Sequence, residues 1–282
     1  MPTRLLFLSI LVVIISSCEK KVSLQLPVKD SQPVLNLLMN KDSMIMARVS
    51  LSNRVNLTDP VLEVKNADVD LYENGTFKEK LLPIVFSGRT WYQGKTLAQT
   101  GATYRVTAVV PGYKEVIGSD QMPDTVPIEE MKFTLAQTDA TINVQLRDDP
   151  AVQNYYRVRL FGISKLWGNN DPRKIQRLFE AEDATLDLFN DKERIEFFTT
   201  DALFNGRSPR FVFKVKNIYS DAYVSIEISS LTYNSYNYLY SAFMAEEKNT
   251  NALSEKVIVF NNIENGLGIV GGVASREYVL KQ

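Results

Sequence analysis

Histidine is absent from this chain of 282 residues, and cysteine occurs once, at position 18. The commonest general base, the commonest zinc ligand and every Ser-His or Cys-His nucleophile pair are therefore missing. An excess of charge of one sign is lacking too, since 32 basic residues stand against 33 acidic ones. A balanced chain has no chain-wide attraction to nucleic acid. These absences argue against histidine-dependent catalysis and against a nucleic-acid partner.

Long hydrophobic runs are scarce, and the clearest one lies at the amino terminus. Arg4 precedes "LLFLSILVVII", residues 5–15, which is apolar except for one serine. This run is shorter than the roughly 20 apolar residues that span a bilayer as a helix. A basic residue before a short apolar run is typical of an export signal. We therefore expect residues 1–17 to be a signal peptide.

The single cysteine ends this signal, in the order Ile15-Ser16-Ser17-Cys18. The four residues resemble a bacterial lipobox, whose cysteine thiol is acylated with diacylglycerol and whose new amino terminus receives a further chain such as palmitate. An ordinary secretory signal with a chance cysteine is the alternative. Several acyl chains anchor stably, because each buried methylene contributes about 0.8 kcal/mol. An acylated Cys18 would bind the lipid bilayer and leave no thiol for disulfides or metal ligation.

The stretch after Cys18, "EKKVSLQLPVKDSQP", is polar and carries two prolines. This composition suits a tether better than a packed element. We expect residues 18–30 to be a lipidated tether, and its charges do not settle which membrane face holds the protein.

From Pro33 onward the dominant period is two, which is typical of strands with one buried face. The runs 33–39 and 44–51 predict a first strand pair, and Asn74-Gly75 between two extended runs predicts a type I′ hairpin. Short strands with turns every eight to twelve residues indicate a β-sandwich of immunoglobulin or transthyretin type. We place this N-terminal domain at residues 31–121.

A boundary is indicated by "SDQMPDTVP", residues 119–127, where prolines and aspartates interrupt the alternation. Beyond it the pattern is cleaner, as in "ATINVQLR", residues 140–147, which puts apolar and polar side chains on opposite faces. Strands with one wet face belong to antiparallel sheets, because parallel sheets are covered on both sides. We predict an all-β chain with a second β-sandwich domain over residues 122–282.

One segment has a helical period instead, near residues 233–248, where Thr232 or Asn234 could cap the start. Its tyrosine-rich stripe could be a ligand platform, although a stripe at helical spacing is more often core packing. A second, weaker helical stretch is indicated near 172–181. The stripe consists of Tyr236, Leu239, Tyr240, Phe243 and Met244.

The end of the chain predicts a buried strand, Val257–Phe260, then a glycine-rich loop and a final strand, Arg276–Leu280. The loop sequence "GLGIVGG" has the glycine spacing of a dinucleotide loop, but no following helix or acidic partner has room before the chain ends. Bulges or positive φ angles in an edge loop explain the glycines better. The glycines are Gly266, Gly268, Gly271 and Gly272.

Adjacent carboxylate pairs, such as Asp148-Asp149 and Glu182-Asp183, are candidates for catalysis. Glycoside hydrolysis needs two converging carboxylates. Neighbours on a strand point to opposite faces, so we interpret both pairs as solvated turn residues. Calcium-loop spacing of oxygen ligands is absent as well. We therefore assign no catalytic residue, no metal site and no cofactor, and expect a protein that is not an enzyme.

Three aromatic residues are the candidate binding residues: Trp91, Tyr92 and Trp167. Each tryptophan stands near glycine and polar amides, as in loops that stack on sugars or contact proteins. A tryptophan that plugs the edge of a sandwich is the alternative interpretation.

Three motifs together carry a resemblance: "CEKKVSLQLP", the helix sequence "SYNYLYSA" and, most specifically, "NNIENGLGIVGG". In their order and spacing the chain resembles a family of Bacteroidota outer-membrane lipoproteins with a domain of unknown function, the family numbered 4249. The first strand departs from it, because the family's glycine and aromatic residue do not follow here.

The resemblance implies a lipid-anchored outer-membrane protein of the cell envelope, without established catalytic residues. It also implies the setting of lipoproteins that accompany TonB-dependent transporters. We therefore expect an accessory lipoprotein that binds a partner such as a transporter barrel in substrate capture or assembly. A glycan-binding module acting through exposed aromatics is the alternative, and a carboxylate-dependent hydrolase is the third.

Overall fold

The computed structural model describes residues 30–52, 61–165, 172–182, 193–218, 221–249 and 255–281. The contacts divide the chain into Met1–Asp30 and a second compact unit, Ser31–Gln282. The second unit is all-β and sandwich-like, as predicted, with two sheets among its described residues. Cys18 and Trp167 lie outside the described residues.

The larger sheet has thirteen strands in the described part of the chain. Along its main path the order is β12-β11-β16-β17-β1-β2-β6-β5-β4-β7-β8, while β14 pairs with β11 and β3 with β2. The strands are β1 (Pro33–Asn40), β2 (Met44–Leu51), β3 (Leu62–Glu63), β4 (Asp68–Glu73), β5 (Thr76–Phe86), β6 (Arg89–Leu97), β7 (Thr103–Val109), β8 (Val116–Gln121), β11 (Tyr155–Lys165), β12 (Pro172–Arg177), β14 (Glu196–Thr200), β16 (Asp221–Leu231) and β17 (Leu267–Lys281).

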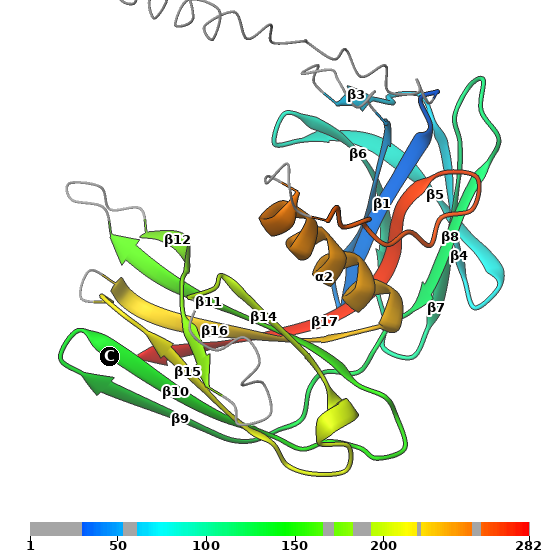
Figure 1. Cartoon of the computed structure of the whole chain (residues 1–282). Helices are drawn as coiled ribbons and strands as arrows, with labels where there is room; N and C mark the ends of the chain where they lie inside the picture. Colours follow the sequence, from blue (N-terminus) through cyan, green and yellow to red (C-terminus); the bar gives the residue numbers. More distant parts are fainter. Residues whose placement is uncertain are drawn as a thin grey trace, which may run out of the picture. The chain divides into compact units, whose positions relative to one another are not determined.

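The smaller sheet has the order β13-β15-β10-β9. Two helical segments complete the described elements, a short 3-10 helix η2 (Asp201–Leu203) and the α-helix α2 (Tyr233–Lys248). Figure 1 shows α2 beside the larger sheet, next to β17 and β1. The strands of the smaller sheet are β9 (Ile128–Ala136), β10 (Asp139–Leu146), β13 (Glu180–Glu182) and β15 (Arg210–Val215).

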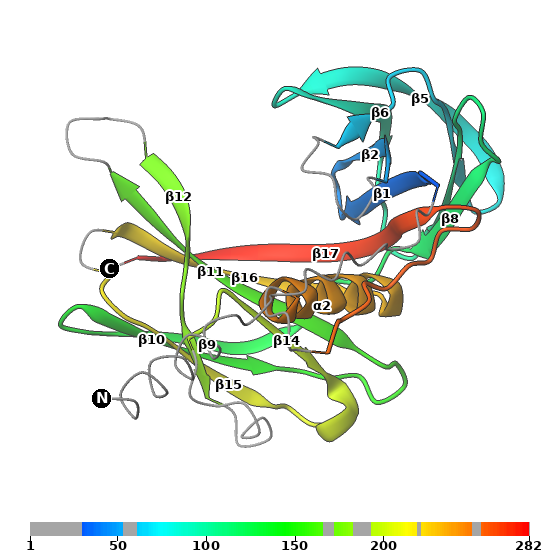
Figure 2. The same cartoon turned by 45° about the horizontal axis from the view of Figure 1, so that its top comes forward.

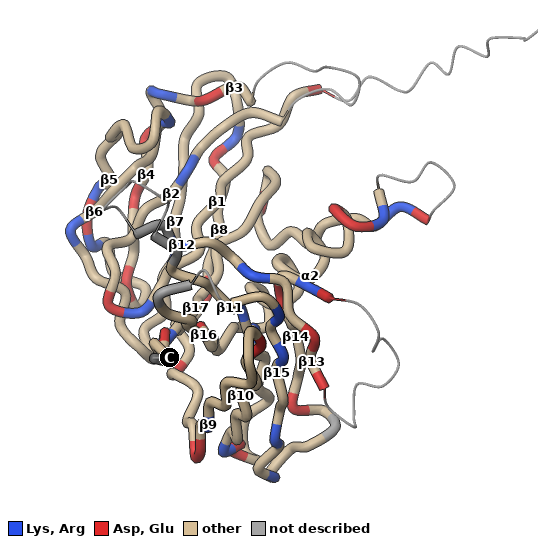
Figure 3. The backbone as a smooth tube through the Cα atoms, turned by 90° about the vertical axis from the view of Figure 1, so that its left-hand side faces the viewer, with Lys and Arg blue, Asp and Glu red and all other residues tan. Residues whose placement is uncertain are grey.

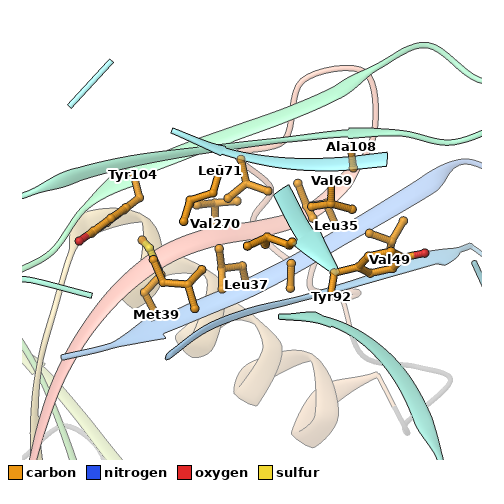
Figure 4. Packing of buried hydrophobic residues seen from close by; sticks show 14 of the residues in the cluster. Leu35, Leu37, Met39, Val49, Val69, Leu71, Tyr92, Tyr104, Ala108 and Val270 are labelled. Atoms are coloured by element: carbon orange, nitrogen blue, oxygen red, sulfur yellow. The ribbon is translucent and has the colours of Figure 1, made fainter. Parts of the chain in front are cut away.

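The N-terminal half, β1 to β8, follows its sequence pattern closely. The predicted pairing of β1 with β2 is confirmed, with Pro33 opposite Leu51. The hairpin between β4 and β5 turns at Asn74 and Gly75, whose φ angles of 51° and 82° are those of the predicted type I′ turn. Alternate residues of these strands point inward and form the first hydrophobic core (Figure 4), which includes Leu35, Leu37, Val69, Leu71, Tyr92, Tyr104 and Val270.

The second core lies between the smaller sheet and the facing part of the larger sheet. In β10 the predicted alternation is confirmed, because Ala140, Ile142, Val144 and Leu146 are all buried. They meet side chains of β11 and β16, such as Leu160 and Ile226. Figure 2 shows β9, β10 and β15 beneath β11, β16 and β17.

The last strand, β17, belongs to both halves. Its first residues pair in parallel with β1, from Val34 opposite Leu267 to Asn40 opposite Val273. Its later residues pair with β16 in antiparallel fashion. Val270 of β17 and Ile263 before it are part of the first core. The core of residues 31–121 is therefore completed by the end of the chain, and the predicted division at residue 121 stays a prediction.

The helix predicted near residues 172–181 is wrong. The segment forms β12 and then β13, and β12 pairs with β11 from Leu160 opposite Arg177 to Lys165 opposite Pro172. Helical spacing over ten residues is a weak signal, and pairing to a neighbouring strand overrides it. The helix at 233–248 is confirmed.

The C-terminal predictions also need correction. Val257–Phe260 is neither a strand nor buried, and Ile258 is 89% exposed. The glycines from Gly268 to Gly272 lie within β17 instead of forming a loop before it. Gly268 has a φ of 117°, and a Cβ there would meet the Leu35 carbonyl oxygen at 2.1 Å. The glycines thus let β17 lie close to β1, which sequence alone does not reveal.

Candidate functional site

Tyr92, one of the predicted binding aromatics, is fully buried in the first core. Its hydroxyl donates to the Val64 carbonyl oxygen at 2.8 Å and accepts from the Ala67 N–H at 2.9 Å. Burial raises the pKa of the Tyr92 hydroxyl, and the Ala67 hydrogen bond lowers it only in part. The alternation of β6 points Tyr92 inward, so its ring offers no surface to a ligand.

Trp91 points to the other face of β6, where it stands opposite Ile84 and is half-buried. Its indole Nε1 is buried, and no hydrogen-bond partner for it is found among the described residues. Of the three predicted aromatics, Trp91 is thus the one whose described position borders the surface.

The carboxylate pair at 148–149 is only half as predicted. Asp149 is exposed, as expected of a solvated turn residue, but Asp148 is buried. Two hydrogen bonds satisfy the buried carboxylate of Asp148, one from the Tyr156 hydroxyl at 2.9 Å and one from the Gly206 N–H at 2.8 Å. Burial, with Asp148 beside it, raises the pKa of Tyr156. Asp148 therefore ties the start of β11 to a loop, which is a structural role.

Only Glu182 of the second pair is among the described residues. Glu182 is exposed and forms an ion pair with Lys214 across β13 and β15, and Asp183 lies outside the described residues. Among the described residues, no group of three His, Cys, Asp or Glu side chains is placed to hold a metal ion.

The helix α2 is held at its start by a partly buried carboxylate, that of Asp120. Thr232 is the N-cap, and its hydroxyl accepts from the Ser235 N–H at 3.1 Å and donates to Asp120 of β8. Asp120 also accepts from the Gly272 N–H at 3.0 Å. Burial raises the pKa of Asp120, against the lowering effect of these hydrogen bonds. One side chain thus joins β8, β17 and α2 and fixes where the helix lies.

The tyrosine stripe of α2 is not core in the ordinary sense. Ser235 is the only fully buried residue of the helix, and its side chain lies against Gly271 of β17. Tyr236 and Leu239 are partly buried against a small cluster formed by Tyr155, Leu231 and Val273. The core-packing interpretation holds for the inner edge of the stripe, while Tyr240 on its outer edge is exposed, and a role as a ligand platform stays a prediction.

The rings around α2 form one connected group, the aromatic cluster, defined as Tyr155, Phe198, Tyr233, Tyr236, Tyr240 and Phe243. Tyr236 and Tyr240 stack at 5.7 Å between centroids, with an interplanar angle of 13°. Phe198 of β14 contacts both, at 6.1 and 5.8 Å. Burial raises the pKa of Tyr236 to about 12, so it stays neutral at physiological pH.

The segment after α2 runs back along the helix. The Val257 N–H donates to the Asn249 side-chain oxygen at 2.9 Å, and the Phe260 N–H donates to the Ser241 hydroxyl at 2.9 Å. Phe260 also meets Tyr233 edge-on at 6.2 Å. We define the α2 apolar surface as the exposed side chains of this pair of segments, namely Tyr233, Tyr240, Ile258 and Val259.

A charged row adjoins the aromatic cluster on the same face of the sheet. Arg159 donates to Glu227 through Nε at 2.9 Å and Nη2 at 2.7 Å. Arg157 is buried, reaches Glu227 at 3.5 Å, and has no partner for its Nε among the described residues. Burial and then the nearby Arg159 lower the pKa of Arg157. With Glu196, which lies 3.8 Å from Arg159, the row holds two basic and two acidic side chains beside α2.

Sequence reasoning missed Ile258 and Val259, because "VIVF" has the composition of a buried strand. An alternation of polar and apolar residues would have indicated a solvent-exposed face, but all four residues are apolar. No helix in the described part of the chain is long and apolar enough to cross a membrane.

The fold and this surface define a class: a β-sandwich protein with no cluster of metal-ligating side chains among its described residues and with an apolar, aromatic surface around one helix. Within that class, the chain belongs to the family described as a domain of unknown function, DUF4249, whose model matches residues 19–278. The membership of the family numbered 4249, which the three motifs indicated, is therefore confirmed. No curated protein matches the sequence.

Several solved structures show a distant likeness. A β-glucuronidase from Parabacteroides merdae is 13% identical with a TM-score of 0.21, over 71% of this chain and 24% of that one. A protein from Bacteroides uniformis, proposed to bind carbohydrate, is 9% identical with a TM-score of 0.25, over 89% and 98%. A DUF4785 family protein from Legionella pneumophila is 11% identical with a TM-score of 0.22, over 83% and 55%. The chain thus spans about a quarter of the β-glucuronidase.

Proposed function

We propose that this chain is a lipid-anchored, non-catalytic binding protein of the cell envelope, which holds a partner protein through the α2 apolar surface. The observation that carries the proposal is the exposure of large side chains around one helix, with Ile258 at 89% and Tyr233 at 59%. Scattered apolar residues are ordinary on a surface, whereas neighbouring ones mark contact sites. Tyrosine rings also serve as rigid anchors at interfaces.

A protein partner fits this surface better than a glycan does. Ile258 and Val259 are branched aliphatic side chains, which offer no flat ring to a sugar and gain from contact with other apolar groups. The stacked rings of Tyr236 and Tyr240 are the feature that favours the second candidate, a glycan. The family resemblance implies an outer-membrane partner, such as the barrel of a TonB-dependent transporter.

Affinity purification of the tagged chain from native membranes tests the partner. We expect an envelope protein to be recovered with the wild-type chain and to be lost when Tyr240→Ser and Ile258→Ser are combined. Val152→Ser is the matched control, because Val152 is 54% exposed and lies in the loop before β11. Equal recovery with the double variant, or the chain recovered alone, contradicts the proposal. Loss of glycan-array binding in the double variant instead would favour the second candidate.

The membrane anchor is tested separately, by fractionation of cells that express the full chain. We expect Cys18→Ser to move the protein out of the membrane fraction, because the acylated thiol is lost. Retention of Cys18→Ser after a high-salt and urea wash, which releases proteins held without a lipid anchor, would contradict the anchor and leave the α2 apolar surface untouched.

A further inference from the structure

The β5–β6 hairpin carries an apolar run that nothing in the described chain covers. Residues 81–86 read "LLPIVF", and beyond Leu81, which is buried, Leu82, Val85 and Phe86 are 59%, 80% and 57% exposed. A strand with one wet face alternates apolar and polar side chains. Here both faces of the strand carry apolar side chains, so apolar surface is exposed to water on both faces. We name residues 82–86 the apolar arm.

The apolar arm has a defined, rigid shape. Its residues pair with β6, from Leu82 opposite Gln93 to Phe86 opposite Arg89. The turn between them is formed by Ser87 and Gly88, whose φ angles of 49° and 71° suit a tight hairpin. The arm is therefore an ordered projection, and its exposure is a property of the fold.

The apolar arm lies at the end of the N-terminal half where the chain enters. Ser31 donates to the Ser52 carbonyl oxygen at 2.7 Å, which places the entry beside the end of β2. At the same end, the Thr90 N–H of the hairpin donates to Glu63 of β3 at 2.9 Å. Figure 1 shows β3, the start of β1 and this hairpin at the same end of the N-terminal half, with β3 between the other two.

The length of chain before Ser31 limits how far this end can be from an anchor. Thirteen residue steps separate Cys18 from Ser31. At about 3.4 Å for each fully extended residue, they reach at most about 45 Å. If Cys18 is acylated as predicted, the apolar arm is held within reach of the lipid surface.

The charges around the apolar arm favour an anionic surface. A hollow of about 300 Å³ lies between β3 and the arm, and Lys65 and Arg89 line it. Neither forms an ion pair with a residue that the structure describes, and both are exposed. The acidic residue of the hollow, Glu63, is engaged by Arg48 at 3.2 Å and by the Thr90 N–H. Figure 3 shows a basic and an acidic stretch next to each other beside β3.

We infer that the apolar arm is a second, non-covalent membrane contact, which inserts Val85 and Phe86 at the lipid surface while Lys65 and Arg89 meet anionic headgroups. Apolar side chains flanked by basic ones bind the interface in this way, with strength that depends on anionic lipid. The inference rests on the predicted acylation of Cys18 and is independent of the α2 apolar surface. This contact would orient the protein relative to the membrane. The acyl anchor alone lets the protein rotate freely, whereas the apolar arm holds one end of it against the bilayer.

The test places a polarity-sensitive dye on the full acylated chain in vesicles of phosphatidylethanolamine and phosphatidylglycerol. Val85→Cys carries the dye in the apolar arm, and Phe77→Cys is the matched control, because Phe77 is 54% exposed at the other end of the same strand. We expect a blue shift and several-fold protection from an aqueous quencher at position 85, with neither at position 77. Combining Lys65→Gln with Arg89→Gln should reduce this protection toward the level in phosphatidylcholine vesicles.

Equal quenching at positions 85 and 77, on a chain that floats with the vesicles, would overturn the inference. Protection that arises only when envelope proteins are added would overturn it in favour of a protein partner. A chain that does not float would remove the acylated anchor and the inference together. Combining Tyr240→Ser with Ile258→Ser should leave the protection at position 85 unchanged, which separates this result from that of the proposed function.

Discussion

At Gly271 of β17 the strand and α2 approach each other closely. A Cβ built there would lie 2.3 Å from the Ser235 hydroxyl oxygen and 3.2 Å from Leu38 Cδ2. The Ser235 oxygen is buried and has no hydrogen-bond partner among the described residues. The small size of Gly271 and Ser235 lets helix and strand approach closely, which larger side chains would prevent, and the buried Ser235 hydroxyl is left without a hydrogen bond among the described residues.

We expect Gly271→Ala to lower the free energy of unfolding by about 1–3 kcal/mol, because the added methyl overpacks the contact. Ser235→Ala should be close to neutral alone and should recover part of this loss in the double variant. Urea denaturation of the four proteins measures the coupling. Strictly additive effects would show that the two residues do not meet.

Glu79 of β5 accepts hydrogen bonds from backbone N–H groups of β6, at the point where β5 stops pairing with β6 and pairs with β4. Its carboxylate accepts from the Thr96 N–H at 2.7 Å and from the Lys95 N–H at 2.9 Å. Burial raises the pKa of Glu79, but these hydrogen bonds outweigh it and hold the pKa below its ordinary value of 4.5. The charged form is thus favoured in the folded chain.

We expect Glu79→Gln to cost on the order of 1 kcal/mol at pH 7, allowing for solvent screening. A lowered folded pKa gives stability that is complete above the unfolded value, near 4.5, and that is lost as the pH falls through the folded value. The difference between wild type and variant should therefore shrink below about pH 4.5. Denaturation across pH 3 to 7 checks this, and a constant difference would be contrary to it.

At the scale of the element, α2 depends on its start more than on its buried area. Thr232 caps the helix and binds Asp120, while Ser235 is the one fully buried side chain of α2 and its apolar side chains are at best partly buried. A helix that buries little apolar surface gains proportionally more from its cap. The α2 apolar surface is therefore positioned by polar contacts at one end.

We expect Thr232→Ala to lower the free energy of unfolding by about 1 kcal/mol, since the Ser235 N–H loses its acceptor. Thr232→Ser keeps the hydroxyl and should retain most of the stability. Chemical denaturation followed by circular dichroism measures both. If the serine variant were as unstable as the alanine variant, the methyl group and not the cap would be responsible.

At the scale of the whole chain, β17 links the two cores. It pairs with β1 over residues 267–273 and with β16 over residues 273–281. Because one strand serves both halves, loss of either core removes a pairing partner from the other. Cooperative unfolding follows from such sharing.

We expect a single unfolding transition for both halves. Trp167→Phe leaves Trp91 as the fluorescent probe of the N-terminal half, and Trp91→Phe leaves Trp167, between β11 and β12 in the sequence, as the other. Both variants should unfold at the same denaturant concentration, with circular dichroism as the control for their stability. Two separate midpoints would instead support independent domains at 31–121 and 122–282.

Local pattern was sufficient for much of this architecture. The period of two in β10, the turn residues Asn74-Gly75 and the helical spacing after Thr232 each act within a few residues, so the sequence predicts them. Where neighbours distant in the sequence decide, prediction failed: residues 172–177 read as helix until β11 pairs with them. The exposure of the outer edge of the α2 stripe could not be predicted either, because it depends on which segments of the chain cover the helix.

By itself, the sequence determined the all-β class, the helix at 233–248, the candidate anchor at Cys18 and the family. Only the tertiary structure decided that β17 completes the first core, that Tyr92 is internal, and that Ile258 and the apolar arm are exposed. The physical reason is that burial and parallel pairing depend on contacts between residues far apart in the chain. The sequence shows that a side chain is apolar, but whether water reaches that side chain depends on the residues that pack against it.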